Sequence, residues 1–172
     1  VDVLCSDKTG TITQNKLTVD KVIGYGGTDE DQVLLNAALA SRAEDNDPID
    51  DAILKKADST EAVKSEQGDY SIRDFVPFDP VIKRTEAEVS KGDREFRVAK
   101  GAPQVILGLA KEKDQIGERV RQDVKDMAAR GSRTLGVAFK EGGSWKMLGL
   151  IGLNDPPRDD SAETIEQGKN MG

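Results

Sequence analysis

The chain has no histidine and a single cysteine among its 172 residues. A disulfide within the chain is therefore impossible, and a zinc site would lack its usual imidazole and paired thiolate ligands. A lone cysteine fits a reducing compartment. No apolar run approaches the roughly 20 residues that a helix needs to cross a bilayer. We therefore expect no direct membrane insertion of this segment.

Aromatic residues make up only 4% of the chain, whereas charged residues make up 33%. This composition predicts a modest core and a well-solvated surface. The formal net charge of −7 argues against a nucleic-acid or membrane-surface binder, and an anionic ligand would need cations gathered locally. The length fits one ordinary domain, or one domain plus part of another. Because the chain begins at Val1 inside an expected strand, we interpret it as a fragment of a longer protein.

The most informative stretch is residues 5–11, Cys-Ser-Asp-Lys-Thr-Gly-Thr, which follows a short apolar run that predicts a buried strand. Asp7 would lie at the carboxyl end of that strand, where open α/β sheets hold their ligands. A carboxylate there can attack a phosphoryl group and form an aspartyl-phosphate. Lys8 would offset charge, and Gly10 would let backbone amides approach the phosphate. The alternative from spacing alone is a strand followed by a glycine turn.

Residues 7–13, Asp-Lys-Thr-Gly-Thr-Ile-Thr, resemble the phosphorylation signature of P-type cation-transporting ATPases. The resemblance implies that Asp7 receives the γ-phosphate of ATP. It also implies that Asp7 and Thr9 contribute to a Mg²⁺ site together with later motifs. Thr9 stands where the wider haloacid-dehalogenase-like superfamily usually has an acid. Because a hydroxyl is a poor general base near neutral pH, a phosphoenzyme would persist, which suits an energy-coupling pump better than a phosphatase.

Phe78 and Lys83 form a second motif. An aromatic ring followed five residues on by a lysine can stack an adenine and place a cation beside it. The segment is similar to the family element in which the Phe stacks the adenine and the Lys lies near the base and phosphates. Ile82 stands where the proton-pump branch usually has an acid, which we interpret as a local change in packing or charge. Without the resemblance, an edge strand with one buried Phe is the favoured interpretation.

Residues 100–103, Lys-Gly-Ala-Pro, form a third motif. Lys100 ends an expected strand, Gly101 removes side-chain bulk, and the proline starts a helix. An ammonium beside a helix N-terminus favours an anion. The resemblance implies that Lys100 lies deep in an ATP pocket. The alternative is an ordinary strand-to-helix turn with a surface lysine.

Three weaker elements complete the resemblance. Arg133 lies in a Gly-x-Arg-x-Leu pattern, and the family implies a contact with nucleotide phosphates, which planar bidentate geometry suits. Asp50, after a proline, aligns with the acid near the adenine amino group. Asp155-Pro156-Pro157-Arg158 resembles the hinge that returns to the phosphorylation domain, where Asp155 and Arg158 would hold the hinge and the phosphate end of ATP. Alone, these residues would indicate solvated charges and a rigid turn.

Periodicity and turn residues predict the regular elements. Helices are expected over 31–43, from Asp47 and Pro48 onward, and over 104–110, 116–130 and from 160 or 161. Residues 58–69 are polar and are expected to form a loop or a frayed helix. Strands are expected over 15–24, 72–76, 83–90, 95–100, 133–140 and 145–153, with a hairpin turn at 91–93.

This order predicts an α/β (α+β) chain in which one domain interrupts another. In the family these are the nucleotide-binding domain, an antiparallel sheet with flanking helices, and a truncated haloacid-dehalogenase-like parallel α/β domain. We assign residues 1–22 to the phosphorylation domain with its motif, 23–153 to the nucleotide-binding domain, and 154–172 to the hinge and return segment.

The resemblance implies the ATP-binding cytoplasmic portion of an integral membrane ion pump, with ATP and Mg²⁺ as cofactors. Residues 15–19, 32–35, 40–42 and 160–165 further resemble the proton-pump branch. Implied partners are the actuator, phosphorylation and membrane domains of the parent pump, and we expect the isolated chain to be monomeric. The family's Thr-Gly-Asp and Gly-Asp-Gly-x-Asn-Asp motifs are absent from the sequence, so we expect ATP binding without useful hydrolysis. Alternatives are a soluble phosphatase or phosphotransferase of the same superfamily and a noncatalytic interaction module.

Overall fold

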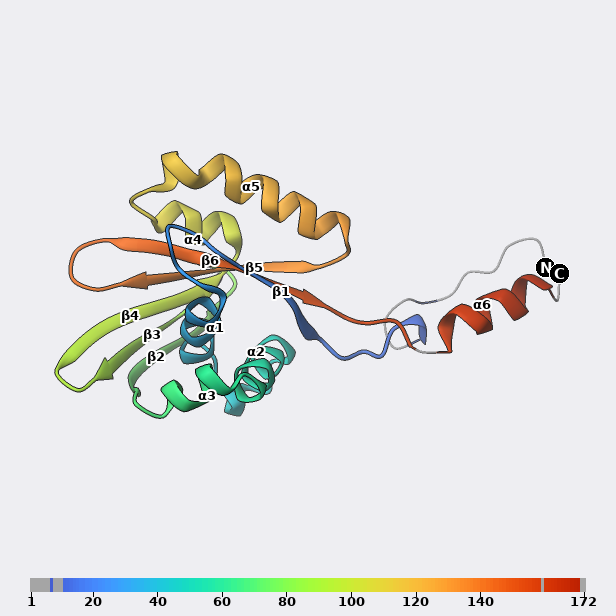
Figure 1. Ribbon diagram of the computed structural model, residues 1–172, viewed down its shortest axis with the longest axis horizontal. Coiled ribbons are helices and arrows are strands. Elements are labelled where there is room, and N and C mark those ends of the chain that lie inside the picture. Colours follow the sequence, from blue (N-terminus) through green and yellow to red (C-terminus); the bar gives the residue numbers. More distant parts are fainter. Residues whose placement is uncertain (1–6, 8–10, 159, 171–172) are drawn as a thin grey trace.

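The computed structural model describes residues 7, 11–158 and 160–170. The predicted strand over residues 1–4 and the residues Lys8, Thr9 and Gly10, with their predicted roles at the phosphorylation site, lie outside the described residues. The described chain forms a sheet with helices on both faces, a connection made of two chain segments, and a helix beyond that connection (Figure 1).

A six-stranded antiparallel sheet forms the centre of the structure, with its strands in the order β1-β6-β5-β4-β3-β2. The predicted hairpin turn joins β3 to β4, with Lys91 opposite Arg94. The predicted α/β class with an antiparallel sheet is confirmed. The strands are β1 (Thr18–Gly24), β2 (Ser71–Asp79), β3 (Arg84–Lys91), β4 (Arg94–Gly101), β5 (Arg133–Lys140) and β6 (Trp145–Asn154).

Helices cover both faces of the sheet (Figure 1). On one face lie α1 (Glu30–Leu39), α2 (Pro48–Ser59) and α3 (Glu61–Gln67), and on the other lie α4 (Pro103–Leu109) and α5 (Lys113–Ala129). Successive side chains of a strand point to opposite faces. In β4, Val98 therefore joins the buried cluster under α1 to α3, and Ala99 joins the cluster under α4 and α5.

Two of the predicted helix starts follow from capping. The Asp29 side chain accepts a hydrogen bond from the Gln32 amide at 2.8 Å and begins α1. Asp47 accepts from the Ile49 amide at 2.7 Å, and Pro48 occupies the first turn of α2. An N-cap side chain satisfies an amide that has no intrahelical partner.

Three expectations about helices were wrong in extent. Residues 58–69 are not a loop, because α2 continues to Ser59 and α3 follows directly, held by the buried side chain of Val63. Helix α1 ends at Leu39 rather than near residue 43, and a short 3₁₀ turn, η2 (Ala43–Asp45), follows. Helix α5 begins at Lys113, three residues before the predicted start. For α3, tertiary packing overrides the local polarity of the sequence.

Residues 12–16 and 154–158 run beside each other outside the sheet. Thr13 pairs with Pro157 in an isolated antiparallel bridge, and the Gln14 amide donates to the Pro156 carbonyl at 3.0 Å. Helix α6 (Ser161–Asn170) follows and lies away from the sheet (Figure 1). No helix within the described ranges is both long enough and apolar enough to cross a membrane.

The predicted boundary between residues 22 and 23 falls inside β1, which pairs with β6 as one edge of the six-stranded sheet. The division into domains, and the insertion into a parallel α/β domain, stay predictions.

Candidate functional site

A cavity of about 420 Å³ opens beside the β2–β3 turn, the end of β4 and the start of β5. A volume of this size suits a small organic ligand. Residues far apart in the sequence line it. Six of the residues singled out from the sequence are among them, namely Asp50, Phe78, Lys83, Lys100, Gly101 and Arg133.

A buried ion pair forms one wall of this cavity. The Lys100 ammonium lies 2.8 Å from the Asp50 carboxylate, and the two side chains are only 4% and 8% exposed. The ammonium also donates to the Ala40 carbonyl at 2.5 Å and to the Thr85 hydroxyl at 3.2 Å. Three acceptors therefore match the three N–H groups of the lysine. Lys100 fastens β4 to the end of α1 and the start of α2.

Burial lowers the pKa of Lys100 from its ordinary value of 10.5, because the loss of water outweighs the attraction of Asp50. The second oxygen of Asp50 accepts a hydrogen bond from the Arg42 amide at 2.9 Å. Both oxygens of this carboxylate are thus engaged by the protein. A ligand amino group at Asp50 would have to share an oxygen with Lys100 or with the Arg42 amide.

The β2–β3 turn presents the aromatic ring. The Asp79 side chain accepts from the amides of Val81 and Ile82 at 2.6 and 3.1 Å, which closes the turn. Lys83 leaves the turn in a left-handed conformation, with φ of 54°. The Phe78 side chain, immediately before the turn, is 58% exposed. The alternative interpretation, an edge strand with one buried Phe, is therefore wrong about burial, although β2 is an edge strand, and the exposed Phe78 lines the cavity.

Gly101 is required by a close approach between strands. A Cβ at this position would lie 2.6 and 2.7 Å from Cβ and Cα of Arg84, and also too near the Lys83 carbonyl oxygen. That carbonyl accepts a hydrogen bond from the Ala102 amide at 3.0 Å. The glycine thus allows the β2–β3 turn to lie directly over the β4–α4 junction, which closes one side of the cavity.

Lys83 and Arg133 supply the charge at this site. Neither side chain makes a hydrogen bond or an ion pair within the part of the chain that the structure describes. Asp47 also lines the cavity, whereas Lys100 and Asp50 offset each other. The lining therefore carries a net positive charge in a chain whose overall charge is −7. Such a local excess of cations attracts an anionic ligand.

Sequence reasoning missed several lining residues, among them Ile49, Thr85, Gln104 and Leu135. Thr85 is the most informative, because its hydroxyl donates to the Ala40 carbonyl at 3.0 Å while accepting from Lys100. The strand pairing that places Thr85 opposite Lys100 was not predicted residue by residue. The Leu of the Gly-x-Arg-x-Leu pattern was a signal for Leu135 that was not used.

Asp155 and Arg158 do not line the cavity and lie instead in the connection. Asp155 accepts from the Thr13 hydroxyl at 2.5 Å and from the Lys16 amide at 3.0 Å. The Arg158 amide donates to the Ile12 carbonyl at 2.9 Å. These bonds join the two segments that run outside the sheet, and the hinge and phosphate roles of Asp155 and Arg158 stay predictions.

Asp7 is exposed and is not among the residues of the cavity. Lys8 and Thr9 lie outside the described residues. Over residues 7, 11–158 and 160–170, no group of three His, Cys, Asp or Glu side chains could hold a metal ion.

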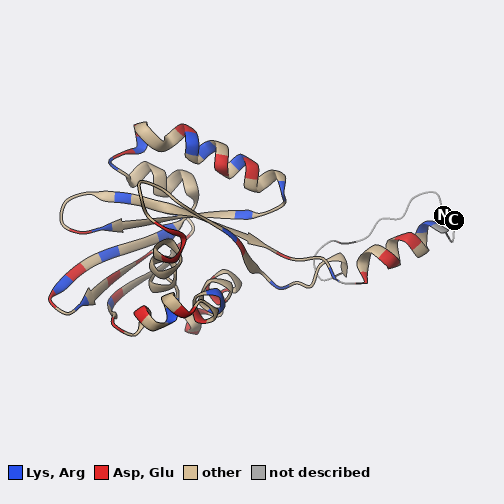
Figure 2. Ribbon diagram, viewed as in Figure 1, with Lys and Arg blue, Asp and Glu red and all other residues tan. Residues whose placement is uncertain are grey.

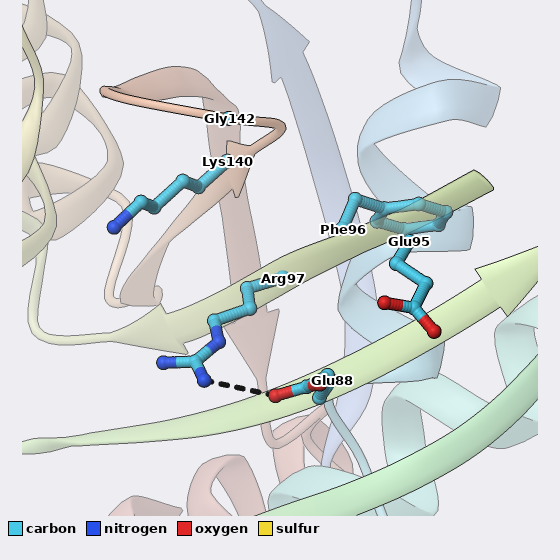
Figure 3. A pocket seen from close by; sticks show the side chains of 6 residues that line it. All are labelled: Glu88, Glu95, Phe96, Arg97, Lys140 and Gly142. Atoms are coloured by element: carbon cyan, nitrogen blue, oxygen red, sulfur yellow. Dashed lines mark hydrogen bonds and ion pairs between the residues drawn. The ribbon is translucent and has the colours of Figure 1, made fainter.

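A second, smaller hollow of about 220 Å³ lies on the surface at β3, β4 and the β5–β6 turn (Figure 3). Arg97 and Glu88 form an ion pair there, with 2.8 Å between nitrogen and oxygen. Lys140 of β5 also lines this hollow (Figure 3). The hollow shares no residue with the 420 Å³ cavity. The pairing of Arg97 with Glu88 across neighbouring strands is typical of a solvated sheet surface.

An antiparallel sheet between two layers of helices, with a cation-lined cavity beside it, is an α/β architecture consistent with a nucleotide-binding domain. No protein-family model matches the chain. Three curated relatives match all of it. A cation-transporting ATPase of Methanocaldococcus jannaschii is 49% identical over 175 residues. The plasma membrane ATPase of Kluyveromyces lactis and plasma membrane ATPase 2 of Saccharomyces cerevisiae are each 41% identical, over 181 and 180 residues.

The chain belongs to the P-type cation-transporting ATPases. It covers 21%, 20% and 19% of the three relatives, so it spans about a fifth of their length. The resemblance inferred from the sequence motifs is confirmed.

Proposed function

We propose that the 420 Å³ cavity binds an adenine nucleotide. The observation that carries the proposal is the convergence of one exposed aromatic ring and two cations without described partners in a single cavity. Phe78 stacks the base, because every base has a planar π-face and stacking on an aromatic ring stabilises the complex. Lys83 and Arg133 bind phosphate oxygens, for which a planar guanidinium has matching bidentate geometry.

Lys100 acts chiefly through its position. Its three donors already meet Asp50, Ala40 and Thr85, so it holds the cavity wall and contributes positive potential to it. Gly101 keeps the wall close to the β2–β3 turn. The affinity for ATP is expected to be weak, about 0.1–1 mM, which corresponds to roughly −4 to −5.5 kcal/mol.

In the parent protein, we propose, ATP bound here drives cation transport. A carboxylate oxygen of Asp7 attacks the γ-phosphorus, the bond from that phosphorus to the bridging oxygen breaks, and ADP leaves. Because Asp7 is not at the cavity, the connection held by Asp155 and Arg158 must bend to bring the two together. Bound Mg²⁺ would neutralise phosphoryl charge, with Asp7 and Thr9 as proposed contributors alongside segments outside this chain.

The proposals about the transported ion and the membrane location rest on the names of the relatives. Their names describe cation transport and a plasma membrane. We therefore propose that the parent protein is an ATP-driven ion pump of the proton-transporting branch. This chain would form a cytoplasmic part of it and contact its actuator, phosphorylation and membrane domains. By itself the chain is expected to bind ATP and to leave it intact.

The test is a titration of the 172-residue chain with ATP, followed by NMR and calorimetry. Chemical-shift changes are expected around Phe78, Lys83 and Arg133. The variant Phe78→Ala should weaken binding by about 1–3 kcal/mol, or roughly five- to 150-fold, the scale of a lost base–aromatic stack. Val81→Ala is the matched control, because Val81 is apolar, 85% exposed and absent from the cavity lining.

Equal loss of affinity in both variants would refute the assignment of Phe78, and shift changes confined to other surfaces would refute the cavity as the nucleotide site. Turnover of a generic phosphate ester by the chain would instead favour the phosphatase alternative. Acid-stable labelling of Asp7 from radiolabelled ATP would contradict the expectation that the isolated chain lacks phosphoryl transfer.

A further inference from the structure

A third cavity, of about 460 Å³, lies in the groove between α4 and α5 and has no role in the proposed nucleotide chemistry. Its lining combines an apolar floor with charged side chains at the rim. Leu107 and Gly108 of α4 and Val120 and Val124 of α5 form the floor, and Lys113 and Arg121 stand at the rim.

One helical position beside the floor of this α4–α5 groove carries no side chain. Gly108 lies next to the last residue of α4, and a Cβ there would meet no atom within 4 Å apart from its chain neighbours and the backbone of its own helix. Beneath it, Leu107 and Val120 are only 9% and 2% exposed, and Val124 is half-buried. A hollow of this size with an apolar base suits the body of a small organic molecule.

The rim carries a net single positive charge, from Lys113 and Arg121 against Asp114. Neither Lys113 nor Arg121 forms an ion pair or a side-chain hydrogen bond within the described ranges. Elsewhere on α5, acidic and basic residues alternate along the helix (Figure 2). The two rim cations are therefore available to a ligand with one negative charge.

The Arg121 guanidinium reaches back along α5 toward the turn that begins with Lys113. Side chains on a helix lean toward its N-terminus, and a Cβ at Gly117 would lie 3.2 Å from Nη1 of Arg121. The guanidinium thus lies over Gly117, one helical turn from Lys113. Lys113 is the first residue of α5, where the helix dipole adds positive potential.

We propose that the α4–α5 groove is a regulatory site for a small amphipathic monoanion. The apolar body of the ligand packs on Leu107, Val120 and Val124, and its acid group lies between Lys113 and Arg121. This ligand is distinct from the nucleotide, because the groove offers no exposed aromatic ring and only one net positive charge.

The groove is coupled to the nucleotide cavity through shared residues. Pro103 and Gln104 line both. They begin α4 immediately after the β4–α4 junction, where Gly101 meets the β2–β3 turn. A ligand that shifts the start of α4 therefore changes the nucleotide cavity. The coupling, which rests on the nucleotide function proposed above, must act equally in both directions.

The probe for the test is 4-phenylbutyrate, which has an apolar ring and one carboxylate. A titration of the chain without nucleotide, followed by NMR, is expected to give saturable shifts at Gly108, Val120 and Arg121. Gly108→Leu should fill the groove and weaken binding by more than about tenfold without harm to the helix. Arg121→Gln should weaken it roughly five- to tenfold, whereas Lys125→Gln, on the same helix outside the groove, should not change it.

The neutral analogue 4-phenylbutan-1-ol lacks the carboxylate. Its affinity for the unchanged chain should be about as low as the affinity of 4-phenylbutyrate for the Arg121→Gln variant. In a second titration, saturating 4-phenylbutyrate should change the dissociation constant of ATP about fivefold, and saturating ATP should change that of the probe by the same factor.

Binding that survives Gly108→Leu, equal effects of Arg121→Gln and Lys125→Gln, or no saturable binding would overturn the site. An unchanged ATP affinity at saturating probe would overturn the coupling. Failure of ATP to bind at all would refute the nucleotide function alone, because the first titration contains no nucleotide.

Discussion

Separating Lys100 from Asp50 should destabilise the chain more than any other change of a single charge within the described residues. Each is almost fully buried, so removing one leaves the other charged in a poorly solvated place. Breaking such a pair typically costs about 3–5 kcal/mol. We expect that loss for Lys100→Met and for Asp50→Asn, out of a total stability of roughly 5–15 kcal/mol.

The double variant should be less destabilised than the sum of the two single variants. With both charges gone, no unpaired ion remains, the new amide can still accept from the Arg42 amide, and Thr85 still donates to the Ala40 carbonyl. We expect a loss of about 1–3 kcal/mol, the cost of imperfectly satisfied polar groups. The resulting coupling energy should therefore exceed about 2 kcal/mol.

Urea unfolding followed by circular dichroism provides the measurement, with the slope m compared across variants. The pair formed by Arg97 and Glu88 is a matched control, because its nitrogen–oxygen distance is also 2.8 Å while its side chains are 54% and 37% exposed. Its disruption should cost about 0–1 kcal/mol. The argument from burial would be refuted if the single variants of Lys100 and Asp50 lowered the free energy of unfolding no more than this control does. A double variant whose loss equals the sum of the two single losses would also refute it.

Three further outcomes follow from contacts elsewhere. Gly101→Ala should destabilise the chain by about 1–3 kcal/mol and weaken ATP binding, because the new Cβ meets backbone that must move; urea unfolding and calorimetry check both effects. Burial and the hydrogen bond to Asp123 raise the pKa of Tyr25 above 10, so the folded chain keeps this proton where the unfolded chain loses it. The unfolding free energy should therefore fall as the pH rises above about 10, and less steeply in Tyr25→Phe. Thr13→Val should remove the hydroxyl that donates to Asp155 and speed amide hydrogen exchange in the connection, whereas unchanged exchange would show that this bond does not hold it.

The motif residues were identifiable because each carries its signal in a few consecutive positions. Phe78 with Lys83, and Lys100 with Gly101, combine residue types whose chemistry suits a nucleotide, and the family resemblance ordered them. Their convergence was an expectation from that order. The structure places them in one cavity, although their functional roles stay predictions until a ligand is bound.

Other features could not be predicted from local sequence. Residues 58–69 are polar and suggested a loop or a frayed helix, yet residues 61–67 form the helix α3, in which Val63 is buried in the cluster that α1 and α2 share. Asp50 and Lys100 each suggested a ligand contact, and their mutual ion pair became visible only when β4 met the start of α2. An interaction between residues 50 positions apart depends on packing that no local pattern encodes.

The sequence by itself determined the alternation of strands and helices, the caps that begin α1 and α2, and membership in the ATPase family, because these depend on neighbouring residues and on short motifs. Only the tertiary structure decided which charges neutralise each other and which remain available. Lys100 is enclosed by acceptors from three segments, whereas Lys83 and Arg133 have no partner among the described residues. The physical reason is burial. A cation that is desolvated and paired stabilises the packing of the protein, whereas a cation that lines a cavity without a partner can bind an anionic ligand.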